Sequence, residues 1–283
     1  MKKKSALKQS PLLPIAMLAI AVALLVYQYR APTTLFLWQE YRVLPELALS
    51  TGQSASLAFE MGNYYFNWGG GSPHAYDLDR AQKFYQYAYK SDPGLSALGL
   101  QLGRTHFLEA EFAEAVVLFS SYINEKEGTD DPYIENAYYL RGLTYAYANM
   151  FPRAEEDFKK LLDWEDPGGK WATYIDLSWV YLRWGKFEEA EELLSEAAIL
   201  YPDDPWTLSS YGIALLNLDR YEEAQQVLLR ASEKMKYLTA DDWARAYPGN
   251  HPDMADPGLQ KMREIINYNL GLANAAVDNK LNR

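Results

Sequence analysis

The chain has 283 residues, no cysteine, and 27 basic residues against 38 acidic ones. The first thirty residues contain five of the basic residues and none of the acidic ones, so the remainder carries 22 basic and 38 acidic side chains, a net charge of −16. A surface this acidic repels phosphate backbones, which excludes nucleic acid as a partner. The lack of cysteine agrees with an extracytoplasmic location, although a chain without thiols is stable in either redox compartment.

The amino-terminal part has the pattern of a membrane anchor. Residues 1–10 form a tail with four lysines, and the next seventeen residues, PLLPIAMLAIAVALLVY, have no charged side chain. At about 1.5 Å per residue this run spans roughly 26 Å, slightly less than a bilayer core of about 30 Å. Tyr27 and Tyr29 suit the interface and extend the span. We therefore predict a transmembrane helix over residues 11–29, with the basic tail in the cytoplasm and the rest of the chain outside it.

A cleaved signal peptide is the alternative, because it also begins with a basic tail and an apolar run. The small pair Ala21 and Ala23 lies inside the apolar run, and a cut after Ala31 would place Tyr29 at a specificity position and Pro32 just beyond. Neither is a good cleavage site, so the sequence favours an uncleaved anchor. Residues 30–54, which include LFLWQEYRVLPELAL, read as a linker with a short amphipathic helix that caps the first unit of the next region.

Residues 55–238 repeat one pattern. A small residue in a first predicted helix is followed twelve positions later by an alanine in a second predicted helix, with large apolar residues three before and four after that alanine. The pairs are Gly103 with Ala115, Gly142 with Ala154, Ser178 with Ala190, and Gly212 with Ala224; an earlier copy has Gly62 and Ala81 with seven residues added in the turn. Spacings of this kind predict helical hairpins, and one hairpin cannot bury its apolar face without stacking on copies of itself.

The pattern resembles the tetratricopeptide repeat family, whose 34-residue unit requires small residues where its two helices cross. The resemblance implies an all-α solenoid of about five units, with a further first helix in residues 258–283 near Ile265–Val277. Departures are local: Ser178 replaces a crossing glycine, and Tyr122 and Leu161 replace a later small residue. Residues 239–257 between the solenoid and this helix are polar and contain prolines, so they read as a long loop whose Trp243 and Tyr247 fold back over the last repeats or bind a partner.

The candidate catalytic and ligand-binding patterns are weak. The three glycines from Gly69 lack the lysine and hydroxyl residue of a phosphate loop. Paired glutamates such as Glu188 and Glu189 fall at the start of second helices, where acids suit the helix dipole and face water. His251 with Asp253 and Asp256 is the one group with metal-ligand side chains, but it lies in a proline-interrupted stretch. We therefore expect no enzyme activity, no metal and no cofactor.

The inner surface of the solenoid remains as the candidate site. In the family the resemblance points to, first-helix positions that flank the crossing residue line this surface. The groove residues predicted on that basis are Asn63, Phe66, Asn67, Arg104, Tyr139, Tyr147, Trp179, Arg183, Asn217 and Tyr268. Aromatic rings with scattered amides and arginines suit a peptide or helix partner, so we predict a membrane-anchored protein-interaction scaffold or assembly factor. A glycan-binding component of an envelope or polysaccharide-export system is the alternative, because rows of Tyr and Trp also stack on sugar rings.

Overall fold

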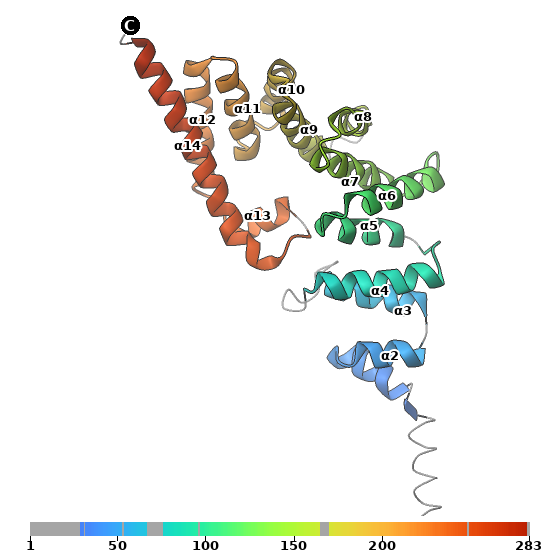
Figure 1. The fold of residues 1–283 in the computed structure, drawn as a ribbon. Coiled ribbons are helices and arrows are strands. Elements are labelled where there is room, and N and C mark those ends of the chain that lie inside the picture. The colour runs from blue at the N-terminus through green and yellow to red at the C-terminus, as the bar shows by residue number, and fades with distance from the viewer. Residues whose placement is uncertain are drawn as a thin grey trace, which may run out of the picture.

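The computed structural model describes residues 29–30, 32–52, 54–66, 76–95, 97–164, 170–247 and 249–281. Within these ranges the chain is helical, with turns and no strand, and successive helices stack into a curved array (Figure 1). The predicted all-α repeat solenoid is therefore confirmed. None of the helices in these ranges combines the length and the hydropathy needed to cross a bilayer. The predicted anchor over residues 11–29 lies almost entirely outside the described part of the chain, so it stays a prediction.

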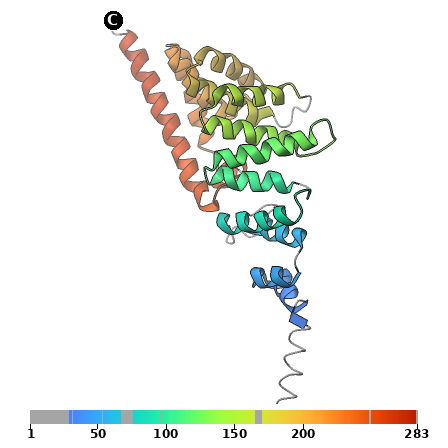
Figure 2. The same ribbon diagram turned by 45° about the vertical axis from the view of Figure 1, so that its right-hand side comes forward.

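Five helical hairpins form the body of the solenoid, as the sequence predicted. They are α3 (Ala55–Tyr65) with α4 (Leu78–Ser91), α5 (Leu98–Leu108) with α6 (Phe112–Lys126), α7 (Ile134–Tyr147) with α8 (Phe151–Leu162), α9 (Lys170–Trp184) with α10 (Phe187–Leu200), and α11 (Pro205–Asn217) with α12 (Tyr221–Met235). Figure 2 shows the same stack turned by 45° about the vertical axis. Each second helix also contacts the first helix of the next unit, which builds a continuous core from units that bury little alone.

The crossing glycines allow the two helices of a unit to approach closely. A Cβ atom added to Gly62, Gly103 or Gly212 would lie 2.4, 2.5 or 2.4 Å from an atom of Tyr85, Phe119 or Leu228. These distances are far below van der Waals contact, so any larger residue would push the helices apart. In the fourth unit the glycine is replaced by Ser178, which is fully buried and whose hydroxyl donates to the Ile175 carbonyl at 2.7 Å.

The same turn joins the two helices in four units. The residue two positions before each second helix is left-handed: Ala110 (φ 60°), Asn149 (φ 59°), Gly185 (φ 79°) and Asp219 (φ 57°). In each turn the next residue donates its N–H to a carbonyl five residues earlier, as Glu111 does to His106 at 2.8 Å. Such a turn ends one helix and reverses the chain within a few residues. Gly185 indicates this geometry most clearly in the sequence, Asn149 and Asp219 indicate it more weakly, and Ala110 does not indicate it.

A buried ion pair fixes the third hairpin. Arg141 of α7 donates from Nε and Nη2 to the two carboxylate oxygens of Asp157 on α8, at 2.8 and 2.7 Å. The two side chains are 17% and 5% exposed. Burial raises the pKa of Asp157, and the Arg141 guanidinium opposes this shift. The pair therefore holds a desolvated carboxylate in place by two charge-assisted hydrogen bonds.

Helices cap the solenoid at its amino end. Residues 32–41 are helical, and α2 (Pro45–Gly52) follows them and packs on α3. Trp38 is completely buried and packs with Ala48, Leu49 and Met61 in one apolar cluster. This cluster covers the first unit, which otherwise would expose its apolar face to water.

The carboxyl-terminal region is more ordered than the predicted loop over residues 239–257. It contains α13 (Ala240–Ala246), a short 3-10 helix (Pro252–Met254) and the start of α14 (Ala255–Leu281). The loop prediction missed α13, which begins at a capping box in which Thr239 and Asp242 satisfy each other's backbone N–H groups. The last helix begins at Ala255 and not at residue 258, because Pro257 is tolerated in a first turn whose N–H groups have no helical partner. Trp243 packs with Leu208, Met235 and Leu259, over Gly258.

Candidate functional site

A hydrogen-bonded tyrosine and aspartate lie on the first helices of neighbouring units. The Tyr139 hydroxyl on α7 donates to Oδ2 of Asp176 on α9 at 2.5 Å. Burial raises the pKa of Asp176 from its ordinary value of 3.8 to about 6, and the hydrogen bond from Tyr139 opposes the shift. Burial also raises the pKa of Tyr139. The carboxyl is thus held in a poorly solvated site and gains or loses its proton close to neutral pH.

Aromatic rings continue this site across three units. The Tyr147 ring centroid lies 5.4 Å from that of Phe107 and 5.1 Å from that of Trp179. The Arg183 guanidinium carbon is 4.8 Å from the Trp179 ring centroid, and Nη2 of Arg183 donates to Oδ1 of Asn149 at 2.7 Å. Tyr147 remains 49% exposed. We call Tyr139, Tyr147, Asp176, Trp179 and Arg183 the central cluster.

A second group lies nearer the amino end. The Arg104 guanidinium carbon is 4.9 Å from the Phe66 ring centroid, and both residues are buried, at 8% and 2% exposure. Burial lowers the pKa of Arg104 to about 10, with the nearby hydroxyls of Tyr85 and Tyr76 opposing the shift. Tyr76 is half-buried, and burial raises its pKa to about 12, with Glu109 adding to the rise. We call Phe66, Tyr76 and Arg104 the amino-terminal cluster.

One stretch of the chain contacts the amino-terminal cluster and passes near Asp176 of the central cluster. We call Tyr247 and residues 249–251, which follow α13, the bridging segment. At the amino-terminal cluster the Tyr76 hydroxyl donates to the Gly249 carbonyl at 2.8 Å, and the His251 ring lies 5.0 Å from the Tyr76 ring. At the central cluster burial raises the pKa of Tyr247 to about 12, with the Asp176 charge adding to the rise. Figure 1 shows the same arrangement, with α13 and the start of α14 lying opposite α5 across the curve of the solenoid.

Glycine is required at the centre of the bridging segment. Gly249 has φ 97°, which a residue with a side chain rarely adopts. A Cβ atom there would lie 3.0 Å from Nη2 of Arg104 and 3.4 Å from Cζ of Phe66. The backbone therefore approaches the amino-terminal cluster more closely than a side chain would allow, and its carbonyl reaches the Tyr76 hydroxyl.

The structure brings together some of the predicted groove residues and separates others. Tyr139, Tyr147, Trp179 and Arg183 form the central cluster with Asp176, and Phe66 and Arg104 form the amino-terminal cluster. Phe66 and Arg104 are buried and do not present an open surface, because Gly249 lies against them. The remaining residues are placed as follows: Asn63 accepts a hydrogen bond from the Tyr85 hydroxyl at 2.8 Å, Asn217 bonds the Ile213 carbonyl of its own helix at 2.8 Å, Tyr268 is 68% exposed on α14, and Asn67 lies outside the described residues.

Sequence reasoning missed Asp176, Tyr76 and most of the bridging segment as site residues. Asp176 lies two positions before Ser178, so its place on the inner surface follows from the repeat register and was available from the sequence. Tyr76 precedes the second helix of a unit with an inserted turn, where the repeat pattern gives no register. Its contact with Gly249 joins residues 173 positions apart, which no local pattern predicts.

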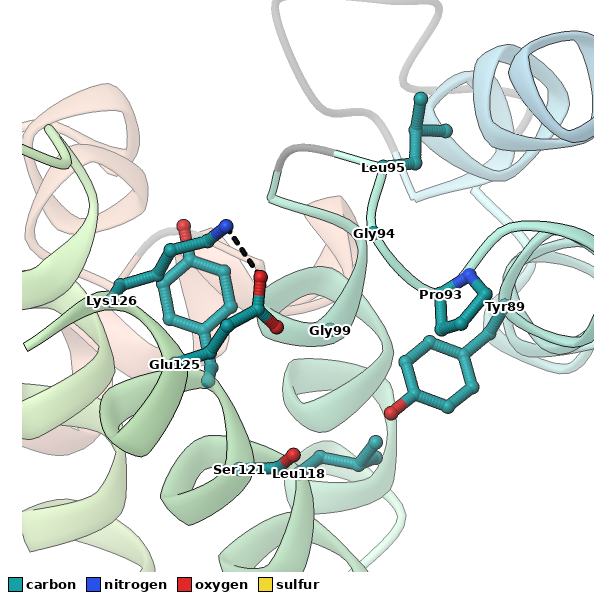
Figure 3. Close-up of a pocket in the computed structure, with 10 residues that line it drawn as sticks. Tyr89, Pro93, Gly94, Leu95, Gly99, Leu118, Ser121, Glu125 and Lys126 are labelled. Atoms are coloured by element: carbon teal, nitrogen blue, oxygen red, sulfur yellow. Dashed lines mark hydrogen bonds and ion pairs between the residues drawn. The ribbon is translucent and has the colours of Figure 1, made fainter.

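Other features of the described residues offer no comparable site. A cleft between α4 and α6, lined by Tyr89, Leu118 and the hydrogen-bonded pair Glu125 and Lys126 among others, has a volume of about 20 Å³ (Figure 3). That is room for one water molecule. No group of three or more potential metal-ligand side chains occurs in the described ranges, and His251 instead accepts a hydrogen bond from the Asp253 backbone N–H at 3.1 Å.

The raised pKa of Asp176 makes stability depend on pH. Between pH 4 and 6 the folded state holds a proton that the unfolded state has released, so stability falls as pH rises through this window. We expect Asp176→Asn, which keeps an acceptor for Tyr139 but has no titrating group, to be more stable than the parent at pH 7 by about 2 kcal/mol. Urea unfolding at pH 4 and at pH 7 measures the difference, with Asp163→Asn at an exposed site as the control. Equal pH profiles for the parent and Asp176→Asn would contradict the prediction.

Comparisons with known proteins identify the type of repeat. Residues 181–236 match the tetratricopeptide repeat family. Similar solved structures include the MamA protein, with 19% identity, 70% of this chain and 97% of that chain covered, and a TM-score of 0.53. A tetratricopeptide repeat protein from Parabacteroides merdae has 14% identity and a TM-score of 0.52, and the match covers 80% of this chain and 94% of that chain. YrrB, described as a TPR protein with an unusual peptide-binding site, has 14% identity and a TM-score of 0.50. The match covers 68% of this chain and 93% of that chain. No curated protein sequence is significantly similar to this chain.

Proposed function

We propose that this chain, an all-α solenoid with repeats of the tetratricopeptide type, is an interaction scaffold that binds an extended segment of a partner protein along its inner surface. One observation supports this most directly. The inner surface already holds a part of its own chain, the bridging segment, in which Tyr247 lies near Asp176 and the Gly249 carbonyl accepts a hydrogen bond from the Tyr76 hydroxyl.

The contacts of the bridging segment indicate the chemistry of a suitable partner. The Tyr247 ring packs on Trp243, with ring centroids 4.8 Å apart, and its hydroxyl is close enough to Asp176 for the carboxylate charge to raise the tyrosine pKa. Two positions later a glycine leaves room for backbone next to Arg104 and Phe66. A backbone carbonyl then accepts from Tyr76. This is recognition of a peptide segment by an aromatic side chain and by a hydrogen bond to the main chain. The peptide-binding site described for YrrB, which has a similar fold, is consistent with it.

The proposal includes the cellular position of the scaffold. The lysine-rich tail and apolar run of residues 1–29 support a single membrane anchor with the solenoid on the extracytoplasmic side. A reporter fused after Arg283 should then behave as extracytoplasmic, and the full-length chain should remain in the membrane fraction. Release of a fragment shorter by about thirty residues would mean that the segment is a cleaved signal peptide.

The binding test uses the bridging segment itself as the probe. A labelled peptide of residues 244–254 is titrated into the full chain and into a variant in which residues 247–251 are replaced by glycine and serine. We expect the variant to bind the peptide about tenfold or more tightly than the parent, because in the parent the tethered segment competes at a high effective concentration. Tyr76→Phe in the variant background should weaken binding, and a scrambled peptide should not bind.

The same variant separates the two classes of ligand. If neither protein binds the peptide while a glycan array gives saturable binding that depends on Trp179, the inner surface binds sugars and the peptide proposal is wrong. If no probe binds and the replacement of residues 247–251 changes only the melting temperature, the bridging segment is structural and the inner surface is not the site.

A further inference from the structure

Exposed apolar side chains are concentrated in the amino-terminal cap of the solenoid. Of the nineteen large apolar side chains that are exposed in the described ranges, six lie within residues 29–47: Tyr29, Phe36, Tyr41, Val43, Leu44 and Leu47. The Phe36 and Tyr41 rings also contact each other, with centroids 6.0 Å apart. The terminal cap of a repeat array normally has a polar outer face, because water covers it. An apolar outer face on this cap therefore indicates contact with something other than water.

Both helices of the cap carry such a side chain opposite their buried face. Phe36 lies two positions before Trp38, and Leu47 lies two positions before Leu49. Trp38 and Leu49 are buried in the cluster that covers the first unit. Side chains two positions apart lie about 200° apart around a helix, so Phe36 and Leu47 point away from that cluster. Figures 1 and 2 show α2 at the end of the array, beyond α3, so we call this side the end face of the solenoid.

Contacts within the cap prevent these side chains from turning inward. The Thr34 and Thr51 hydroxyls, one on each helix, are 2.8 Å apart and share a hydrogen bond. In the turn between the helices, the Arg42 guanidinium pairs with Glu60 of α3 at 2.9 Å and lies 5.2 Å from the Trp38 ring centroid. The two helices are thus fixed against each other and against the first unit, and the end face stays apolar.

The neighbouring sequence indicates that a lipid surface covers the end face. The uncharged run of residues 11–27 ends nine residues before Phe36, which is about 14 Å along a helix, so a membrane anchor in that run keeps the cap beside the bilayer. Residues 29–52 contain two basic and two acidic side chains, whereas residues 53–283 contain 21 basic and 36 acidic ones. Anionic headgroups therefore repel the repeats and do not repel the cap.

On the basis of the membrane anchor inferred above, we propose that the end face, which carries Phe36 and Leu47, lies in the headgroup layer of the bilayer. Tyr29 lies two turns before Phe36 on the same side of the helix, and Tyr41 contacts the Phe36 ring. Tyrosine is enriched at this depth, because its ring is apolar and its hydroxyl is polar. The exposed Glu40, one turn after Phe36, suits headgroups and not hydrocarbon. This contact holds the solenoid in one orientation on the membrane.

Quenching by labelled lipids in the full chain tests this contact. Because the chain has no cysteine, Leu47→Cys carries a single environment-sensitive fluorophore, and the labelled chain is reconstituted in phosphatidylcholine vesicles. We expect blue-shifted emission that lipids with a nitroxide on the headgroup quench strongly. Leu229→Cys is the matched control, because Leu229 is 50% exposed but lies on α12, near the other end of the solenoid. Its emission should be that of a fluorophore in water and should not be quenched.

Two added charges separate lipid binding by the cap from mere closeness to the anchor. Phe36→Glu combined with Tyr41→Glu should remove most of the quenching at Leu47→Cys, because charges replace the apolar side chains that enter the headgroup layer. Val117→Glu combined with Tyr237→Glu, at two highly exposed sites on the repeats, should leave the quenching unchanged. Circular dichroism confirms that each variant keeps its helices.

The outcomes distinguish this inference from the anchor on which it rests. A Leu47→Cys probe that stays in water while the chain resists carbonate extraction would overturn the inference and leave the anchor standing. Quenching that persists with both glutamates in the cap would do the same, because the anchor alone would then hold the cap near the lipid. Carbonate extraction of the parent chain from the vesicles would overturn the anchor and this inference together.

Discussion

Replacing Arg141 by methionine should lower the free energy of unfolding by about 3 to 5 kcal/mol. The loss is large because the substitution breaks a buried ion pair. The variant leaves the Asp157 carboxylate 5% exposed and without its two hydrogen bonds. A desolvated charge that has lost its partner costs more than the pair contributed in the first place. Urea unfolding followed by tryptophan fluorescence measures the loss.

The double variant Arg141→Met/Asp157→Leu provides the control. It removes both charges and fills the space with apolar atoms, so it should be clearly more stable than Arg141→Met alone. Acid should also rescue the single variant, because the carboxyl pKa, already raised by burial, rises further once the guanidinium is gone, and the protonated form carries no charge. A double variant as unstable as the single one would show that the loss comes from packing and not from the unpaired carboxylate.

The second large effect concerns binding. Tyr147→Ala combined with Trp179→Ala should weaken capture of the 244–254 peptide by about thirtyfold or more in the chain whose residues 247–251 are replaced. The two rings lie 5.1 Å apart on adjacent units, and their faces supply the aromatic part of the central cluster. Tyr147 is 49% exposed, so its loss should change the melting temperature little, whereas Trp179 packs against the core and its loss should lower it. Binding is therefore measured well below the melting temperature of the double variant.

Tyr237→Ala serves as the control for the loss of an exposed ring, since Tyr237 lies after α12 and outside both clusters. Fluorescence polarisation of the labelled peptide gives the affinities of all three proteins. If the double variant binds the peptide as tightly as its background does, recognition rests on the amino-terminal cluster alone, and the central cluster has only a packing role.

The repeat fold could be predicted from the sequence because the identity of a residue gives its side-chain volume, and the crossing positions require small side chains. Gly103 opposite Phe119 and Gly212 opposite Leu228 can be read from spacing alone, and the structure places them in contact. The turn conformations could be predicted less well from the sequence. Ala110 adopts the same left-handed conformation as Gly185, although alanine has no preference for it. In that case the packing of the two flanking helices imposes the conformation and outweighs the local cost.

The site was predicted in outline and not in detail. First-helix register placed Tyr139, Tyr147, Trp179 and Arg183 on one surface, and they form the central cluster. The same register placed Phe66 and Arg104 on that surface, but they lie beneath the bridging segment. The reason is a contact between Tyr76 and Gly249, which depends on how far the stacked units curve back on themselves. Curvature accumulates from small rotations between units, and single residues do not encode it.

The bridging segment has a mechanical consequence. A solenoid whose units touch only their neighbours extends under tension like a spring, one unit at a time, because no contact links its ends. Here the Tyr76 hydroxyl and the Gly249 carbonyl join parts of the chain 173 residues apart. A load applied between α3 and α13 is therefore borne first by this closure, and the helical hairpins begin to stretch only after it opens. The molecule would respond to pulling with one discrete release followed by gradual lengthening, so tension transmitted through the chain would set when the inner surface becomes accessible.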